Sequence, residues 1–385
     1  MKFAIAGGGT GGHLFPALAV GEVLRDRGHD ILIFISEKEV DALAIKGRSE
    51  FRFEKLPSVG MPRIFSPEIL TFLWRFNASL APCRRILADF GADAVLGMGG
   101  FTSTAPILAG KMRRIPTFVH ESNAIPGKAN RLNGRLVDTV LLGLAECRRH
   151  FPKARHEVTG TPIRRGLVRR VPREEALAAF GLRPDRTTVL IMGGSQGARG
   201  INRAAMETAP QLKDEKVQFL HLTGAADEAE VRAAYEAAGF PAKVAAFCHE
   251  MEAAYSTADL VIARSGAASL AEIAHFGLPS ILVPYPFAAE NHQYFNAEIF
   301  ARAGAATLLK ESDITGKVLA AVIRNLSADA DQRRLMGSRC RELSPEDAAV
   351  RVADVVEKAA ADHARTPPNS PNPPQPPKPD NQPVV

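Results

Sequence analysis

A loop of almost bare backbone lies near the N-terminus, where residues 7–12 comprise five glycines and Thr10. It follows a short apolar run, Phe3 to Ala6, that predicts a first strand, and it precedes a helix over about 16–27 that Pro16 is suited to open. Backbone N–H groups in such a loop can face an anion, and the helix N-terminus adds partial positive charge. The stretch therefore predicts a phosphate or pyrophosphate site, with His13 as the titratable side chain at its end.

Two other interpretations of this loop stay open at the level of these residues. Gly7, Gly9 and Gly12 have the G-x-G-x-x-G spacing of dinucleotide-binding folds. An apolar run over 31–35 follows, and Glu37 stands just beyond it, roughly where an acid that binds a ribose would be expected. An NAD-dependent enzyme is therefore one alternative, and a glycine turn that binds no ligand is another.

Two stretches of the second half also carry residue types that recognise ligands. Ser265 and Gly266 follow an apolar run over 260–263, so they should begin a helix whose free N–H groups form another anion site. Glu272 lies two turns further on, where a carboxylate can accept hydrogen bonds from two vicinal hydroxyls, although a surface glutamate fits the same pattern. The amide and imidazole side chains of 291–293 cluster at a predicted helix start, which suits sugar hydroxyls and equally suits helix capping.

Length and composition limit the class of protein. A chain of 385 residues predicts two domains, and 46% apolar with 23% charged residues is typical of soluble globular proteins. The four cysteines form no C-x-x-C pair, which argues against a disulfide framework or a zinc site and favours a reducing compartment. We expect no signal peptide and no membrane span, because no apolar run is long enough for either. The net charge of +6 favours anionic partners, but no recognition helix or array of stacking aromatics indicates nucleic acid.

Strand-like and helix-like segments alternate along the chain in two similar halves. The pattern pauses near 159–162 and restarts, and each half has a glycine loop after an early strand, at 7–12 and at 193–197. Such alternation predicts βαβ units, hence two parallel sheets with helices on both faces. The carboxyl ends of the strands in both halves are expected to line one cleft, where open α/β sheets bind ligands. The proline-rich stretch after 366 predicts a disordered tail.

Six motifs carry a resemblance to a known family. They occur in the order seen in the MurG family of peptidoglycan glycosyltransferases, and the match runs from about residue 2 to about 360. The motifs are Gly8-Gly9-Thr10-Gly11-Gly12-His13, Gly97-Met98-Gly99-Gly100, His120-Glu121-Ser122-Asn123, Gly193-Gly194-Ser195-Gln196-Gly197-Ala198-Arg199, Arg264-Ser265-Gly266-Ala267, and His292-Gln293 with Asn296-Ala297. This resemblance disfavours the dehydrogenase interpretation.

The resemblance implies an α/β protein of the GT-B fold, with two Rossmann-like domains facing each other across a cleft. We expect an N-terminal acceptor-binding and membrane-facing domain at 1–162 and a UDP-GlcNAc-binding domain at 163–342. A C-terminal helix at 343–362 is expected to return to the first domain, and 363–385 to be disordered. The implied reaction moves N-acetylglucosamine from UDP-GlcNAc to the 4-hydroxyl of the muramoyl sugar in lipid I, giving lipid II with inversion and without a cofactor. A UDP-sugar epimerase and a non-catalytic nucleotide-sugar-binding protein are the alternatives.

The resemblance also implies roles for individual residues. Thr10, Gly11 and Gly12 of the first half would border the phosphates, and Asn123 would contact the donor sugar. Arg164 of the connection and Ser195 of the second half would hold the diphosphate. Backbone groups of Cys248 would frame the uracil, and Gln293 would bind the sugar hydroxyls. The ribose and diphosphate would be bound by a continuous segment: Ala267, Ala268, Ser269, Leu270, Ala271 and Glu272. Cys248 stands where an aliphatic residue is common, and His292 replaces a glutamine of some members, so Gln293 is the firmer assignment.

An inverting transfer needs a base for the acceptor hydroxyl and stabilisation of the departing diphosphate. His13 is the candidate base and Glu121 the second candidate. Loop N–H groups, a helix N-terminus and Arg164 can stabilise the leaving group without a metal. The Asp-x-Asp sequence at 329–331 follows no strand, and we interpret it as a solvated helix face rather than a metal site.

A lipid-linked acceptor also requires a membrane surface. The predicted helix over 66–90 carries large apolar residues at 69–76, including Phe72 and Trp74, which fit either a buried core or a membrane-facing patch. Arginines and a lysine nearby favour docking to anionic lipid: Arg63, Arg75, Arg84, Arg85, Lys111, Arg113 and Arg114. We therefore expect a peripheral protein at the cytoplasmic face of the cell membrane, with other cell-wall synthesis proteins as further candidate partners.

Overall fold

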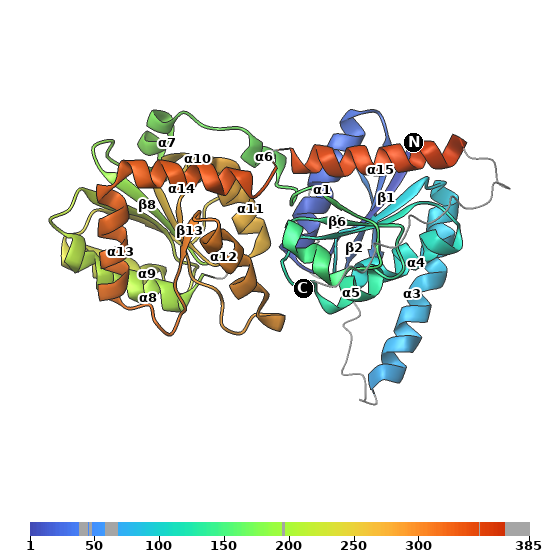
Figure 1. The fold of residues 1–385 in the computed structure, drawn as a ribbon, viewed down its shortest axis with the longest axis horizontal. Coiled ribbons are helices and arrows are strands. Elements are labelled where there is room, and N and C mark those ends of the chain that lie inside the picture. The colour runs from blue at the N-terminus through green and yellow to red at the C-terminus, as the bar shows by residue number, and fades with distance from the viewer. Residues whose placement is uncertain (38–44, 46–47, 58–67, 195–196, 346, 366–385) are drawn as a thin grey trace, which may run out of the picture.

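Two parallel β-sheets, one from each half of the chain, form the framework (Figure 1). The computed structural model describes residues 1–37, 45, 48–57, 68–194, 197–345 and 347–365, and for 68–77 the backbone alone. The tail after 365, Ser195 and the side chains of Phe72 and Trp74 therefore lie outside the described residues.

The first sheet has the order β3-β2-β1-β4-β5-β6-β7. Its strands are β1 (Lys2–Ala6), β2 (Asp30–Ser36), β3 (Arg52–Leu56), β4 (Ala94–Gly97), β5 (Thr117–Glu121), β6 (Thr139–Leu142) and β7 (His156–Val158). The central strands are buried on both faces, which is why they appear in the sequence as unbroken apolar runs rather than as alternating patterns. The helices around this sheet are α1 (Gly11–Asp26), α3 (Glu68–Phe90), α4 (Thr104–Met112) and α5 (Lys128–Asn133), with 3-10 turns at Phe101–Ser103 and Ala145–His150.

The second sheet repeats the plan with the order β10-β9-β8-β11-β12-β13. Its strands are β8 (Thr187–Met192), β9 (Val217–Leu222), β10 (Ala242–Ala245), β11 (Leu260–Ala263), β12 (Ser280–Leu282) and β13 (Ala306–Leu308). The helices are α7 (Arg173–Phe180), α8 (Arg199–Thr208), α9 (Glu228–Ala238), α10 (Met251–Thr257), α11 (Ala267–Phe276), α12 (His292–Arg302), α13 (Gly316–Ala328) and α14 (Ala330–Glu342), with 3-10 turns at Ala209–Leu212 and Ala289–Asn291. The expectation of two parallel α/β sheets is confirmed.

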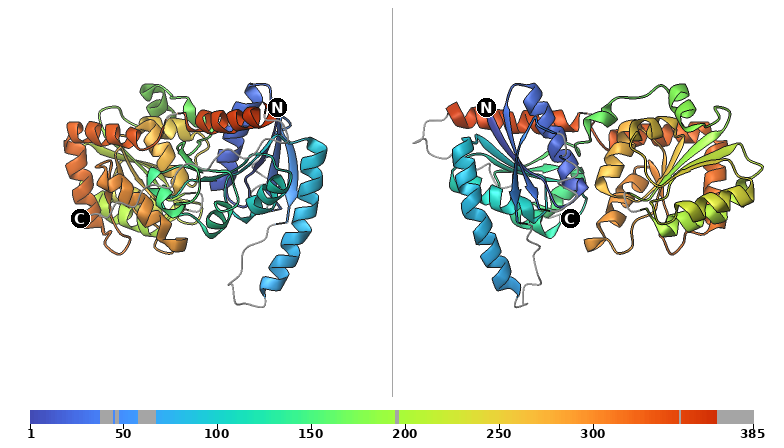
Figure 2. Two further views of the ribbon diagram at one scale, coloured as in Figure 1. Left: turned by 45° about the vertical axis from the view of Figure 1, so that its right-hand side comes forward. Right: turned by 180° about the vertical axis from the view of Figure 1, so that it is seen from behind.

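The last helix, α15 (Ala348–Arg365), lies against the first sheet although it follows α14 of the second half (Figures 1 and 2). Its Val352 and Val356 are fully buried in one apolar cluster with Leu14 of α1 and Phe3 of β1. Arg27, just after α1, pairs with Asp354 and Glu357 of α15. Apolar burial, with ion pairs at its margin, therefore holds α15 to the half in which the chain begins.

The chain crosses between the halves twice, and the two crossings touch. A short helix, α6 (Arg165–Val168), belongs to the first crossing, and the segment between α14 and α15, described at 343–345 and 347, belongs to the second. Gly160 has φ 77°, and a Cβ atom there would lie 2.7 Å from Cδ of Pro345. A side chain at residue 160 would therefore meet both a strained backbone conformation and a clash, which accounts for the glycine at this pause in the pattern.

The first helix differs from the sequence-based expectation. It begins at Gly11 and not at Pro16, which lies in its second turn. Gly11, Gly12 and His13 consequently belong to the first turn, and the His13 N–H donates to the carbonyl oxygen of Thr10 at 3.1 Å. Pro16 is tolerated there at the loss of one backbone hydrogen bond, and its ring is buried.

Candidate active site

The first glycine loop and the loop after β4 pack around His13. A Cβ atom at Gly99, which has φ 109°, would lie 2.9 Å from Nε2 of His13, so the imidazole occupies the space that a side chain there would need. Thr10 Oγ1 lies 3.2 Å from His13 Nδ1. The ring is half-buried, and these contacts fix its position at the carboxyl end of β1, beside the N-terminus of α1.

Glu121 ends β5 with its carboxylate buried and surrounded by donors. Oε1 accepts hydrogen bonds from the backbone N–H of Asn123 (2.9 Å) and from its Nδ2 (3.0 Å). Oε2 accepts from the N–H of Gly127 (3.1 Å) and from Nδ2 of Asn130 (2.9 Å). Burial raises the pKa of Glu121, and these hydrogen bonds oppose that rise. The carboxylate thus organises the loop over 121–130, which carries Asn123.

Arg164 joins the first crossing to both halves. Its guanidinium lies over the ring of Phe15 of α1, 5.0 Å from the centroid, and Nη2 is 3.8 Å from Oε1 of Glu272 on α11. Tyr255 Oη of α10 donates to Oε2 of Glu272 at 2.8 Å. Burial raises the pKa of Glu272, while the Arg164 charge and the Tyr255 hydrogen bond lower it. The Glu272 side chain is 15% exposed.

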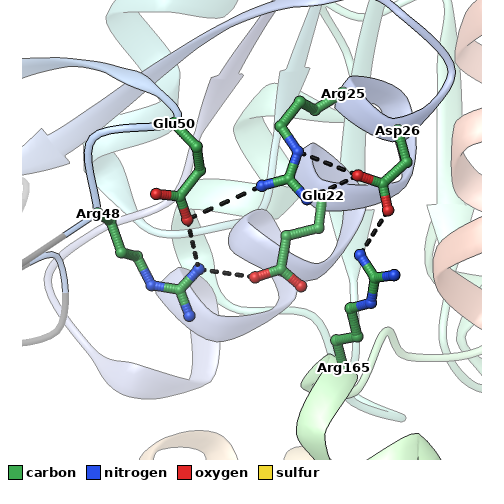
Figure 3. A network of polar contacts seen from close by, with 6 residues as sticks. All are labelled: Glu22, Arg25, Asp26, Arg48, Glu50 and Arg165. Carbon is green, nitrogen blue, oxygen red and sulfur yellow. Dashed lines mark hydrogen bonds and ion pairs between the residues drawn. The ribbon is translucent and has the colours of Figure 1, made fainter.

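Ion pairs surround the end of α1, and Arg165, the residue after Arg164, takes part in one of them (Figure 3). Arg165 pairs with Asp26 at the end of α1, and Asp26 also accepts from Arg25. Arg48 pairs with Glu22 of the same helix, 2.6 Å away. Exposed pairs of this kind stabilise a fold by at most about 1 kcal/mol each, so their main effect here is orientation.

Residues that the sequence analysis assigned to the donor follow the carboxyl ends of β11 and β12. Gly266 is the N-cap of α11, so the N–H groups of Ala267, Ala268 and Ser269 lie in its first turn, followed by Leu270 and Ala271. Ser265 Oγ donates to the carbonyl of Gln293 (2.7 Å), and Gln293 Oε1 accepts from the N–H of Tyr285 (3.0 Å). The ten-residue α11 can therefore stabilise an anion at its N-terminus next to the Gln293 side chain.

Other assigned residues lie at the edges of this region. Cys248 is half-buried between β10 and α10, and burial raises the pKa of its thiol. His292 Nδ1 lies 2.7 Å from the carbonyl oxygen of Ala289 within its own turn. Gly193 and Gly197 of the second glycine loop are both required, since a Cβ atom at Gly197 would lie 2.0 Å from the carbonyl oxygen of Thr223.

The Asp-x-Asp sequence at 329–331 makes contacts within its own helix in the described part of the chain. Asp329 is the N-cap of α14 and accepts from the N–H of Gln332 at 2.8 Å, and Asp331 pairs with Arg334. Among the residues that the structure describes, no cluster of three or more His, Cys, Asp or Glu side chains could hold an ion. The Asp-x-Asp sequence thus serves helix capping and a surface ion pair.

Two hollows lie between the halves. One of about 290 Å³ is lined by Phe15 and Arg48 of the first half, by Arg164, and by His249 and Met251 of the second half, beside Cys248. The larger one, of about 370 Å³, lies at the crossings and is lined by α1, α6, α11 and the start of α15, with neither glycine loop in its wall. Neither glycine loop lines the smaller hollow either, and of the assigned residues Arg164 lines the smaller hollow and Ala271 the larger one.

The sequence suggested no role for Asn296, although this residue lies in the sixth of the family motifs, beside Ala297. Its side chain is fully buried on α12, and it contacts Asn123 and Ala124 of the first half. The sequence did contain a signal for it, because an amide three residues after Gln293 lies on the same face of a helix as Gln293. Asn130, Phe15 and Tyr255 were missed as well, since their contacts join segments that are distant in sequence.

Comparisons with known proteins agree with this architecture. Residues 3–142 match the model of the glycosyltransferase family 28 N-terminal domain, and 188–352 match that of the family 28 C-terminal domain. A protein of Geobacter sulfurreducens named UDP-N-acetylglucosamine--N-acetylmuramyl-(pentapeptide) pyrophosphoryl-undecaprenol N-acetylglucosamine transferase is 39% identical over 359 residues, 92% of this chain and 97% of the relative. A protein of Solibacter usitatus with the same name is 37% identical over 93% of this chain and 96% of its own length.

Solved structures show the same two-sheet arrangement. The crystal structure of Acinetobacter baumannii MurG superposes with a TM-score of 0.76 at 26% identity, over 93% of this chain and 99% of that one. A UDP-GlcNAc 2-epimerase of Neisseria meningitidis gives 0.66 at 14% identity, over 93% and 100% of the two chains, which is a similarity of fold alone. The family models and the full-length relatives together show that this chain belongs to glycosyltransferase family 28 and is a glycosyltransferase of the GT-B fold.

Proposed function

We propose that the protein transfers N-acetylglucosamine from UDP-GlcNAc to the 4-hydroxyl of the muramoyl sugar in lipid I, forming lipid II with inversion at the anomeric carbon. The observation that carries the proposal is similarity over nearly the full length, at 39% identity, to a transferase named for this reaction. The geometry is consistent with it, because a helix N-terminus suited to an anion follows β11 in one half and the half-buried imidazole of His13 follows β1 in the other.

The donor is held by the second half and by Arg164, and Asn123 of the first half contacts its sugar. The first-turn N–H groups of α11 and the Arg164 guanidinium bind the diphosphate, with Ser195 as a further contact predicted from the sequence. Glu272 accepts hydrogen bonds from the ribose hydroxyls, Gln293 binds the sugar, and backbone groups at Cys248 frame the uracil. Fixed dipoles and a cation at the leaving group stabilise the charge that develops as the bond to UDP breaks.

The acceptor side is built around His13. Neutral imidazole takes the proton of the acceptor hydroxyl, whose oxygen bonds to the anomeric carbon from the face opposite UDP, and the bonding pair of the broken C–O bond leaves with UDP. Thr10 fixes the ring through Nδ1. We assign Glu121 a positioning role, because all four of its donors belong to its own loop.

The reaction is tested with radiolabelled UDP-GlcNAc and a lipid I analogue. Release of UDP only in the presence of the acceptor, with label in the lipid product, is the expected result. Epimerisation without acceptor would identify a UDP-sugar epimerase, and binding without turnover would identify a nucleotide-sugar-binding protein. The epimerase rests on similarity of fold alone and is disfavoured by the full-length transferase relatives.

Domain boundaries at 162/163 and 342/343 are part of this proposal. The first boundary falls in the crossing that carries Arg164, and the second precedes the segment that leads to α15. The first domain together with α15 would then bind the acceptor, and the second domain the donor.

We also propose that the protein docks on the cytoplasmic face of the membrane through α3 and its surroundings. Among the helices that the structure describes, none combines the length and apolar content needed to span a bilayer. The start of α3 extends beyond the rest of its half (Figures 1 and 2), and Arg84, Arg85 and Lys111 are exposed on α3 and α4. A variant with Phe72→Ser and Trp74→Ser should no longer float with anionic vesicles yet should still use a water-soluble acceptor. Unchanged flotation would place the docking surface elsewhere.

A further inference from the structure

One buried amide, that of Asn296 on α12, bonds to both halves of the molecule. Its Nδ2 donates to Oδ1 of Asn123 and to the carbonyl oxygen of Ser265, each at 3.1 Å. Its Oδ1 accepts from the backbone N–H of Ala124 at 2.9 Å. The side chain therefore ties the loop after β5 in the first half to the loop after β11 in the second.

The orientation of these amides follows from Glu121. A carboxylate only accepts hydrogen bonds, so the amide of Asn123 must present Nδ2 to Glu121 and Oδ1 to Asn296. Asn296 must then present its own Nδ2 to Asn123, and the Ser265 carbonyl and the Ala124 N–H require the same orientation. Each member of this chain, from Glu121 through Asn123 and Asn296 to Ser265, has its donor and acceptor roles set by its neighbours.

The link differs from the other polar contacts across the interface. Arg131 and Glu290 also face each other from the two halves, at 3.5 Å, but both side chains are about 40% exposed and salt weakens such a pair. Asn296 is 0% exposed and Ala124 1% exposed, and Ala124 packs into the apolar core of the second half. Separation of the halves would break two of the three Asn296 hydrogen bonds and release Asn123 from its partner.

We propose that Asn296 is a positioning residue, which holds the Asn123 side chain in its sugar-contacting orientation while the two halves are docked. This inference rests on the proposed function, in which Asn123 contacts the donor sugar. Through Asn296, the first half contributes to the donor site in one defined interdomain arrangement. Formation of that arrangement then becomes a requirement for transfer, whereas the uridine diphosphate part of the donor is bound by the second half and Arg164 and does not need it.

The test is a double-mutant cycle with Asn123→Ala, Asn296→Ala and the double variant. Each single substitution should lower kcat by about tenfold, and the double variant should be no slower than the slower single one, because coupled residues are not additive. The affinity for UDP, which lacks the sugar, should stay within about twofold of wild type in all three. Glu298→Ala is the matched control, since Glu298 lies two residues along α12, is partly exposed and pairs with Arg302, and it should retain wild-type kcat.

Asn296→Asp makes the test independent of any packing defect caused by alanine. It keeps the shape of the side chain and the acceptor for Ala124, but it turns an oxygen toward Oδ1 of Asn123 and the Ser265 carbonyl. It should match Asn296→Ala in kcat and retain UDP affinity. A double variant about a hundredfold slower, the product of the two single effects, would overturn the inference, as would a loss of UDP affinity parallel to the loss of kcat. Absence of acceptor-dependent turnover in the wild-type protein would instead overturn the proposed function.

Discussion

The Nη2 atom of Arg164 lies 3.8 Å from Oε1 of Glu272, and through this pair the connection between the halves touches the helix assigned to the donor. The arginine side chain is 39% exposed and stacks on Phe15, so it can turn toward a ligand without losing its support. A diphosphate would compete with Glu272 for the guanidinium. Donor binding would thereby free the carboxylate for the ribose hydroxyls.

Replacement of Glu272 by alanine should weaken donor binding. Each hydrogen bond from a hydroxyl to a carboxylate contributes about 1.5–3 kcal/mol. The Michaelis constant for UDP-GlcNAc should therefore rise about tenfold or more, whereas Glu298→Ala should leave it unchanged. Calorimetry of UDP binding measures the effect directly, and an unaltered affinity would exclude Glu272 from the ribose site.

Replacement of His13 should slow transfer while sparing the donor. General base catalysis contributes about 10²–10⁴-fold, so His13→Ala and His13→Asn should both lower kcat by that order. Asparagine keeps a polar side chain but lacks basicity, which separates proton transfer from simple hydrogen bonding. Donor affinity should be nearly unchanged, because its assigned ligands lie elsewhere. If His13→Asn stays within a few-fold of wild type in steady-state kinetics, the base is another group.

Glu121→Gln distinguishes positioning from catalysis at that site. The amide replaces one acceptor oxygen by an NH₂ group, which must face N–H donors that now lack a partner. Unfolding free energy should fall by about 1–3 kcal/mol in a denaturant titration. The pH profile of the residual activity should keep the shape of the wild-type profile. A variant of wild-type stability that has lost one limb of that profile would make Glu121 the base.

His221 on β9 should make stability depend on pH. It lies between Tyr235 Oη (2.7 Å) and Asn202 Oδ1 (3.0 Å), and burial lowers its pKa from 6.5 to about 3. Between these values the unfolded chain binds a proton that the native state does not, so the stabilisation is complete above about pH 6.5 and is lost as pH falls toward 3.

The contribution of this one group is about 1.4 kcal/mol per pH unit within that window. His221→Gln removes the titrating group but keeps an amide that can donate and accept, so its stability should decline less steeply from pH 6 to pH 4. Parallel decline in the two proteins, measured by denaturant unfolding at each pH, would mean that His221 does not titrate as burial requires.

The sequence by itself determined the local elements and the family. The apolar runs at 3–6 and 260–263 coincide with β1 and β11, because strands buried on both faces must be apolar throughout. The glycine loops could be recognised as candidate anion sites, because a loop without side chains beside a helix start exposes backbone N–H groups. By contrast, β7 and β10 are short strands at the sheet edges with polar or charged residues, and such segments give little periodic signal in the sequence.

The tertiary structure decided which of the candidate residues act together. Glu121 had the chemistry of a base in the sequence, but its oxygens are occupied by Asn123, Gly127 and Asn130 once the loop folds around it. The start of α1 at Gly11 depends on the packing of the loop, which outweighs the local preference of Pro16 for a first turn. Asn296 meets Asn123 across 173 residues of chain. Hydrogen bonds and burial across such separations arise only when the two sheets dock, and no local pattern encodes that geometry.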